Sequence, residues 1–321
     1  MQMAREMIVW CRSLRVLPWL LLAWLASCGG GTAQIEPFKP RQTISIGDET
    51  VGLLPDGTRY GINALNADNV FDCGQLPIWS QQLSTSFGFA TDFCNAPGAP
   101  GVTRAFAHAK AADLEGQISA QIAATGVTSK DLYVVMVGMN DIIELYETYV
   151  GDRSCITADS NPPGGTLMGE LSARGHTVAV QVSRILALGG RAIVSTVHDL
   201  GYTPYALTRN AVNPGQTTLL SCMTSVFNAR VRVDIKPLDG RFWGLVLADD
   251  DTVATFRNPG SGGATNVTDP ACAVALPNCT TATLVPGANT GYLWADDLHF
   301  GPPMHNQLGN QAITRAHNNP F

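Results

Sequence analysis

The sequence predicts an α/β fold, a three-layer α/β/α sandwich with a mostly parallel central sheet. Short apolar runs end at glycine or at polar residues, which is typical of buried parallel strands. Between these runs, apolar residues recur at the 3.6-residue period of a helix. Charged residues make up 14% of the 321 residues and glycines number 32, which favours a loop-rich globular chain over a coiled or disordered one. Because strands and helices alternate, helices should cover both faces of the sheet.

The strands deliver polar residues to one edge of this predicted sheet. They are expected at 43–46, 132–137, 192–197 and 243–247. The first strand stops at Gly47, and two carboxylates, Asp48 and Glu49, follow it. The second ends at Gly138 and is followed by Asn140. Open α/β folds keep their sites at the carboxyl ends of parallel strands, so Glu49 and Asn140 should lie at the same edge.

Helices and loops account for the rest of the chain. Apolar positions at helical spacing are Trp79, Leu83 and Phe87; Leu114, Ile118 and Ile122; Leu171, Val178, Val182 and Ile185; and Leu219, Met223, Val226 and Phe227, and a closing helix is expected at 303–316. Segments rich in Gly, Pro, Asn or Thr predict loops at 52–75, 95–102, 151–168 and 252–292. The chain shows no internal repeat and no second hydrophobic system. We therefore expect one domain over residues 41–321.

The first residues are typical of an export signal. Three arginines precede an apolar run from Val16 to Ala26, which is too short to span a bilayer comfortably. The run ends in Leu25-Ala26-Ser27-Cys28, which resembles the bacterial lipobox and predicts that Cys28 is lipidated. We expect residues 1–28 to be a signal peptide and residues 29–40 a flexible tether. The protein should then be exported and anchored in a membrane through Cys28, in the outer membrane because Gly29 is not aspartate.

Cysteine usage agrees with export. Apart from Cys11 and Cys28, six cysteines remain, an even number that suggests up to three disulfides outside the cytosol. Six thiols allow about 15 pairings, and the sequence alone does not choose among them. We expect each bond to bracket one loop-like segment. The expected pairs are Cys73–Cys94, Cys155–Cys222 and Cys272–Cys279.

Four stretches of the chain carry a recognisable pattern. They are Ile46-Gly47-Asp48-Glu49, Val137-Gly138-Met139-Asn140-Asp141, Val197-His198-Asp199-Leu200-Gly201-Tyr202-Thr203-Pro204 and Asp296-Asp297-Leu298-His299. In order and spacing they resemble the blocks of the GDSL/SGNH family of serine esterases and lipases. The resemblance runs from about residue 43 to the last helix and implies a flavodoxin-like SGNH-hydrolase fold and ester hydrolysis.

The resemblance also implies roles for individual residues. His299 corresponds to the catalytic base, Asp296 to the carboxylate that orients it, and Asn140 to the oxyanion donor. The stretch at 104–111 matches the family's glycine block poorly and places Ala109 in a glycine slot, where a backbone N–H donor could survive. The serine nucleophile is missing, because Glu49 follows Gly-Asp in its place.

Glu49 changes the chemistry. A carboxylate that attacks an ester forms an acid anhydride, and the carboxylate leaves more readily than the alkoxide, so the intermediate reverts. Three readings stay open. Glu49 or the Asp296–His299 pair activates a water in an unusual hydrolase; the chain is inactive and binds a ligand or partner in the same cleft; or the cleft has no present role. In the first two, Glu49 and His299 should lie within hydrogen-bond reach, with the pKa of the histidine raised and that of the glutamate lowered.

Composition and spacing argue against other functions. The net charge of −6 argues against a nucleic-acid surface. No Cys or His spacing suggests zinc, and the acidic triplet at 249–251 reads as a solvated turn, so we expect no metal and no cofactor. His108, His176, His198 and His317 read as isolated histidines. The expected partners are a small ester or acylated ligand and the membrane, with the protein a monomer.

Overall fold

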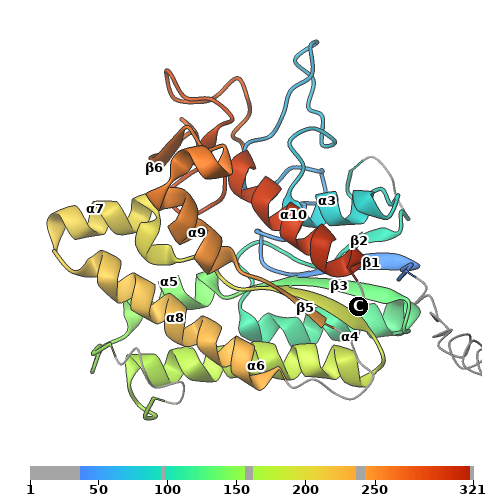
Figure 1. Ribbon diagram of the computed structural model, residues 1–321, viewed down its shortest axis with the longest axis horizontal. Helices are drawn as coiled ribbons and strands as arrows, with labels where there is room; N and C mark the ends of the chain where they lie inside the picture. Colours follow the sequence, from blue (N-terminus) through green and yellow to red (C-terminus); the bar gives the residue numbers. More distant parts are fainter. Residues whose placement is uncertain (1–36, 95–97, 156–161, 236–242, 319–321) are drawn as a thin grey trace, which may run out of the picture. The chain divides into compact units, whose positions relative to one another are not determined.

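The computed structural model describes residues 37–318 except 95–97, 156–161 and 236–242 (Figure 1). The described residues belong to one compact unit, Pro37–Phe321. The expected signal peptide, lipobox and Cys28 lie outside the described residues, as does the tether up to residue 36. No helix in the described part is long and apolar enough to cross a membrane.

The core is a five-stranded sheet in the order β2-β1-β3-β4-β5, and every neighbouring pair is parallel. The strands are β1 Gln42–Gly47, β2 Gly101–Thr103, β3 Asp131–Met136, β4 Arg191–Ser195 and β5 Trp243–Val246. This is the doubly wound order of flavodoxin-like folds. The predicted fold class is confirmed. Strand β2 lies at the end of a segment read as a loop, because three residues are too few for a visible period.

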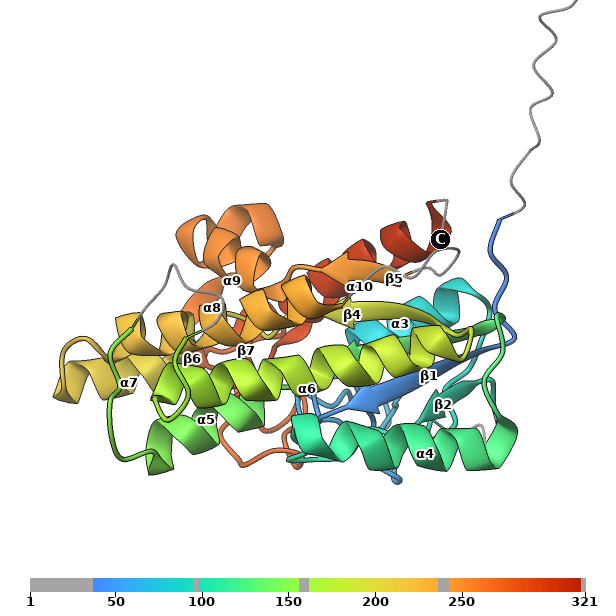
Figure 2. The ribbon, with the colours of Figure 1, turned by 90° about the horizontal axis from the view of Figure 1, so that it is seen from below.

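Helices cover both faces of this sheet. They are α3 Trp79–Ser86, α4 Leu114–Thr125, α5 Met139–Thr148, α6 Leu167–Ala187, α7 Pro204–Val212, α8 Gln216–Asp234, α9 Ala248–Arg257 and α10 Pro302–His317. Alternate residues of a strand face opposite sides. Tyr133 and Val135 therefore pack with α4, α6 and α8, whereas Val134 and Met136 pack with α3 and α10. Figure 2 shows α4 and α6 on one side of the sheet and α3 and α10 on the other.

Three helices were absent from the sequence prediction. Helix α5 begins directly after β3. Helix α7 begins at Pro204, where the Thr203 side chain accepts the N–H of Ala206 as an N-cap. Helix α9 lies at the start of the segment read as a loop, and its first turn is the acidic triplet, which suits the positive end of a helix dipole. The triplet was expected to be a solvated turn, but it lies in a helix and Asp249 forms an ion pair with Arg232. A second small sheet, β6 Asn266–Pro270 and β7 Tyr292–Trp294, also forms in this part of the chain.

All three expected disulfides are present: Cys73–Cys94, Cys155–Cys222 and Cys272–Cys279. The bonded cysteines are 21, 67 and 7 residues apart in the sequence. Cys272–Cys279 closes a short loop, and Cys73–Cys94 closes a segment that contains α3, but Cys155–Cys222 encloses α6, β4 and α7. The expectation that each bond brackets a loop-like segment is therefore wrong for Cys155–Cys222. Each bond still restricts the unfolded chain.

Two glycines shape the turns at the carboxyl ends of β1 and β3, the edge of the sheet where the predicted site residues lie. Gly47 ends β1 with φ 129°, and a Cβ there would lie 1.8 Å from the Met136 carbonyl oxygen on β3. Gly138 follows β3 with φ 128°, and a Cβ there would meet the Phe227 ring at 2.3 Å. Other residues would be strained at both positions. The two turns let β1 and β3 end side by side, so that Glu49 and Asn140 reach the same edge.

Candidate active site

Glu49 lies at the carboxyl end of β1, with 3% of the residue exposed. Its carboxylate accepts three kinds of donor. Asn140 Nδ2 lies 3.2 Å from Oε1 and 3.1 Å from Oε2, and the His108 backbone N–H donates to Oε2 at 2.7 Å. His299 Nε2 lies 3.2 Å from Oε1. A buried carboxylate is tolerated only when its oxygens are satisfied in this way.

His299 is held between two carboxylates. Its Nδ1 lies 2.9 Å from both oxygens of Asp296, and its Nε2 faces Glu49. Asp296 also accepts the backbone N–H groups of Leu298 and His299, at 2.9 and 2.7 Å. These local bonds form a tight turn that orients both the carboxylate and the imidazole. The result is a continuous series of hydrogen bonds, Asp296–His299–Glu49–Asn140, which is called the carboxylate chain below. These four residues and the His108 N–H form the rim of the site.

Within the carboxylate chain, electrostatics favour a protonated His299. Burial alone lowers the pKa of His299, but hydrogen bonds and charges from Asp296 and Glu49 outweigh it and raise the pKa to about 10. Burial raises the pKa of Glu49, yet the hydrogen bond and charge of His299 outweigh it and leave this pKa below its ordinary value. Asp296 behaves in the same way, and its pKa is lowered. At neutral pH the centre is an imidazolium between two carboxylates.

The loop at 104–111 contributes differently from the expectation. The N–H of Ala109 donates to the Phe106 carbonyl oxygen at 3.4 Å and not to Glu49. The donor that reaches the carboxylate is the N–H of His108, whose φ of 63° turns it toward the rim. His108 is therefore part of the site and not an isolated histidine. The sequence carried no signal for this, because a backbone donor is placed by the path of a loop and not by its residue type.

The outer side of the site consists of two aromatic side chains. Tyr60 lies with its ring centroid 5.3 Å from that of His299, and its hydroxyl is 3.5 Å from His108 Nε2. The His108 side chain is 72% exposed, whereas that of Glu49 is 1% exposed. Tyr60 comes from the segment at 52–75, which the sequence predicted as a loop without singling out this residue.

The block around 198–204 supports the histidine loop from behind. His198 Nε2 lies 3.0 Å from the Leu298 carbonyl oxygen, and the Tyr205 backbone N–H donates to the Asp297 carbonyl oxygen at 3.1 Å. Asp199 caps its own turn by accepting the N–H of Gly201. Residues of this block are thus positioning residues for the loop that carries His299.

Three neighbouring groups have shifted pKa values, but among the described residues their side chains form no hydrogen bond with those of Asp296, His299, Glu49 or Asn140. His305 is buried against Phe300, and burial lowers its pKa to about 3. Burial likewise lowers the pKa of His198 to about 3. Asp48 accepts the N–H and hydroxyl of Thr50, as a turn brace would; burial first, and then the charge of Glu49, raise its pKa to about 8.

The remaining histidines lie elsewhere on the molecule. His176 contacts Asp234 at 2.6 Å, and His317 contacts Ser86 at 3.0 Å. Among the described residues, no group of three or more His, Cys, Asp or Glu side chains is arranged to hold a metal ion.

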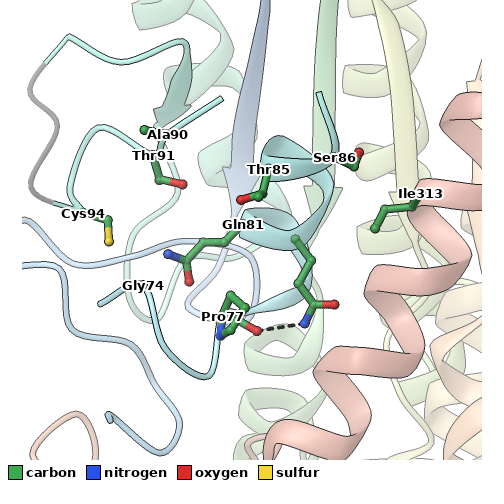
Figure 3. A pocket seen from close by; sticks show the side chains of 10 residues that line it. Gly74, Pro77, Gln81, Thr85, Ser86, Ala90, Thr91, Cys94 and Ile313 are labelled. Carbon is green, nitrogen blue, oxygen red and sulfur yellow. Dashed lines mark hydrogen bonds between the residues drawn. The ribbon is translucent and has the colours of Figure 1, made fainter. Parts of the chain in front are cut away.

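A hollow of about 530 Å³ lies on another part of the surface, beside α3 and the Cys73–Cys94 disulfide. Figure 3 shows Gln81, Thr85 and Ser86 of α3 along it, with Ile313 of α10 on one side. None of the carboxylate-chain residues lines it.

Together, the strand order and this edge define a class: an α/β/α sandwich with a histidine–carboxylate centre at the carboxyl ends of its strands. No protein-family model matches the sequence, and no curated protein matches it. Among solved structures, the acetyl xylan esterase AlAXEase aligns at 10% identity and a TM-score of 0.45, covering 84% of this chain and 96% of its own. Axe2, an acetylxylan esterase from Geobacillus stearothermophilus, aligns at 14% identity and a TM-score of 0.42, covering 87% and 94%. Likeness at this level carries no argument about activity.

Proposed function

We propose that this chain is a GDSL/SGNH-like hydrolase that acts on a small ester or acylated substrate through an activated water. The observation that supports the proposal is the unbroken chain Asp296–His299–Glu49–Asn140 at one rim of the sheet. It contains a base, a group that orients the base and an amide donor, which are the parts that acyl hydrolysis needs once water replaces the serine.

The charge state determines which group takes the proton from water. His299 already carries a proton at neutral pH, so Glu49 is the base next to it. The lowered pKa of Glu49 makes it a weak base, and its oxygens are already hydrogen-bonded. Turnover of esters should therefore be slow compared with that of a serine esterase.

A second function is favoured by one specific contact set. Asn140 and the His108 N–H, the donors available to an ester oxygen, both bind Glu49. An ester carbonyl has to displace the carboxylate from them before it can be polarised. A chain in which that exchange does not occur is an inactive relative that uses the same rim to bind a ligand or a partner.

Hydrolysis of p-nitrophenyl acetate by wild type, His299→Ala, Glu49→Ser and the matched control His176→Ala separates the two. A water-activated hydrolase gives slow turnover in wild type and in His176→Ala, with a loss of roughly 10²-fold or more in His299→Ala. An inactive relative gives no wild-type turnover, while Glu49→Ser gains activity because a serine can then form an acyl-enzyme. Wild-type turnover that is unchanged in His299→Ala contradicts the hydrolase proposal.

We also propose that the protein is exported and anchored in the outer membrane through a lipid on Cys28. The lipobox-like stretch before Cys28 supports this. Metabolic labelling with a radioactive fatty acid should mark the wild-type chain and not Cys28→Ser. Equal labelling of both chains contradicts the anchor.

A further inference from the structure

The behaviour of Glu49 depends on the kind of carbon that it meets. At an ester carbonyl, its attack gives an anhydride that reverts. At a saturated carbon that bears a leaving group, the same attack gives an ordinary alkyl ester of Glu49. Such an ester is stable to reversal, and turnover then requires a second step in which water attacks the carboxyl carbon of Glu49 itself.

The donors of the rim are arranged for that second step. Asn140 Nδ2 lies 3.1 and 3.2 Å from the two Glu49 oxygens, and the His108 N–H lies 2.7 Å from Oε2. When water adds to the carboxyl carbon of an ester on Glu49, negative charge develops on the carboxyl oxygen that these groups already face. Donors that are aimed in advance at the oxygen where charge develops are the main requirement of an oxyanion hole.

We infer that Glu49 is a nucleophile toward saturated carbon, that the substrate is a small epoxide, and that the product is a diol released from an alkyl ester on Glu49. The inference rests on the proposed function in one respect, that the rim is a hydrolytic centre that needs the protonated His299. It differs in the bond that is attacked first.

An epoxide fits the resting centre better than an alkyl halide does. Opening an epoxide leaves an alkoxide that needs a proton, and the imidazolium of His299 stands 3.2 Å from Oε1, next to the attacking oxygen. A halide needs no proton when it leaves, so His299 would stay protonated and could not act as the base of the second step. With an epoxide, the first step itself prepares that base.

The two steps balance. In the first, a lone pair of Glu49 forms a bond to a ring carbon, the C–O ring bond breaks with its electron pair on oxygen, and that oxygen takes the proton of His299. In the second, neutral His299 takes a proton from water as the water oxygen adds to the carboxyl carbon of Glu49. The tetrahedral intermediate collapses, the diol oxygen leaves with the proton from His299, and the carboxylic acid of Glu49 returns its proton to His299.

Access restricts the substrate to small molecules. The Glu49 side chain is 1% exposed, and Tyr60 and His108 stand on its outer side. Their only direct polar contact recorded among the described residues, 3.5 Å between the Tyr60 hydroxyl and His108 Nε2, is at the long limit of a hydrogen bond. The exposed His108 ring also lies near Glu49, with Nδ1 3.9 Å from Oε1. If the ring rotates outward, the Glu49 carboxylate still keeps its hydrogen bonds to Asn140, His299 and the His108 N–H.

The test uses the purified full-length chain and styrene oxide, with mass spectrometry of the intact protein and of its peptides. In His299→Gln the first step can proceed with a proton from solvent, but the second lacks its base. We expect one styrene oxide per chain, on the peptide with Glu49, and phenylethanediol formation reduced by roughly 10²-fold or more. Glu49→Gln should give neither adduct nor diol, and Glu115→Gln, which removes an exposed glutamate, should behave as wild type.

A single turnover of wild type in ¹⁸O-labelled water should place the label in the Glu49 carboxylate and not in the diol. Label in the first diol released, or adducts spread over surface carboxylates and unchanged in Glu49→Gln, would overturn the inference. The result is separable from the ester assay. Hydrolysis of p-nitrophenyl acetate that depends on His299, without an adduct on Glu49, leaves the proposed function standing and removes the epoxide.

Discussion

Three buried histidines lie around the functional edge, and they differ in charge: one is protonated at neutral pH and two are neutral. His299 is 7% exposed, and contact with two carboxylates raises its pKa to about 10. His198 and His305 are similarly buried, both against the ring of Phe300, and burial lowers their pKa values to about 3. Burial is common to all three. The protonation state therefore depends on which partner each ring faces. His299, between two carboxylates, is charged, whereas His198 and His305 form a neutral aromatic cluster with Phe300.

Removing the charged ring should have the largest effect. His299→Ala leaves the buried Glu49 and the half-buried Asp296 as carboxylates without a cation, which costs about 3–5 kcal/mol in the free energy of unfolding. Urea denaturation at pH 7 measures this. The matched control His176→Ala removes a half-exposed histidine paired with Asp234 and should cost about 0–1 kcal/mol. Equal losses in the free energy of unfolding for the two variants would show that the charge of His299 does not stabilise the rim.

The pH dependence sharpens the same comparison. Because the pKa of His299 is raised, its contribution is complete below its unfolded pKa and is lost as pH rises through about 10. The pKa values of Glu49 and Asp296 are lowered, so their contribution is present above their unfolded values and is lost as pH falls through the folded ones.

The difference in stability between wild type and His299→Ala should therefore be greatest from about pH 5 to 6.5. It should decline steadily as pH rises from there toward about 10, and decline again below about pH 5. Denaturation curves at a series of pH values measure this difference. A difference that is constant from acid to alkaline pH would mean that His299 stabilises the fold by packing and not by charge.

A change in the neutral aromatic cluster should have the smallest effect on stability and activity. Neither ring nitrogen of His305 has a hydrogen-bond partner among the described residues. His305→Phe removes two polar atoms from an apolar, aromatic setting, so we expect a change within about 1 kcal/mol. The ester assay should be unaltered within roughly twofold, since a shift in rate of that size corresponds to well under 1 kcal/mol. A loss comparable to that in His299→Ala would mean that His305 holds the rim through contacts that the structure does not contain.

Local sequence signals determined the frame of this protein. Apolar runs stopping at Gly47 and Gly138 predicted the strand ends, and helical spacing predicted most of the covering helices, because both patterns arise from neighbouring residues. The order of the motifs brought Glu49, Asn140 and His299 into one hypothesis, and they do lie together. The pairs Cys73–Cys94 and Cys272–Cys279 could be guessed because each closes a short segment of chain, whereas Cys155–Cys222 encloses α6, β4 and α7 and was settled only by the tertiary structure.

Only the tertiary structure decided which groups are hydrogen-bonded to one another at the site and which histidine is charged. Helices α7 and α9 depend on caps, dipoles and packing partners rather than on a strong apolar period, so the sequence did not reveal them. The donor at Glu49 is the N–H of His108 and not that of Ala109, because the path of a loop aims a backbone group whatever its side chain. The different protonation states of His299 and His305 likewise follow from which side chains surround each ring, and those neighbours come from distant parts of the chain.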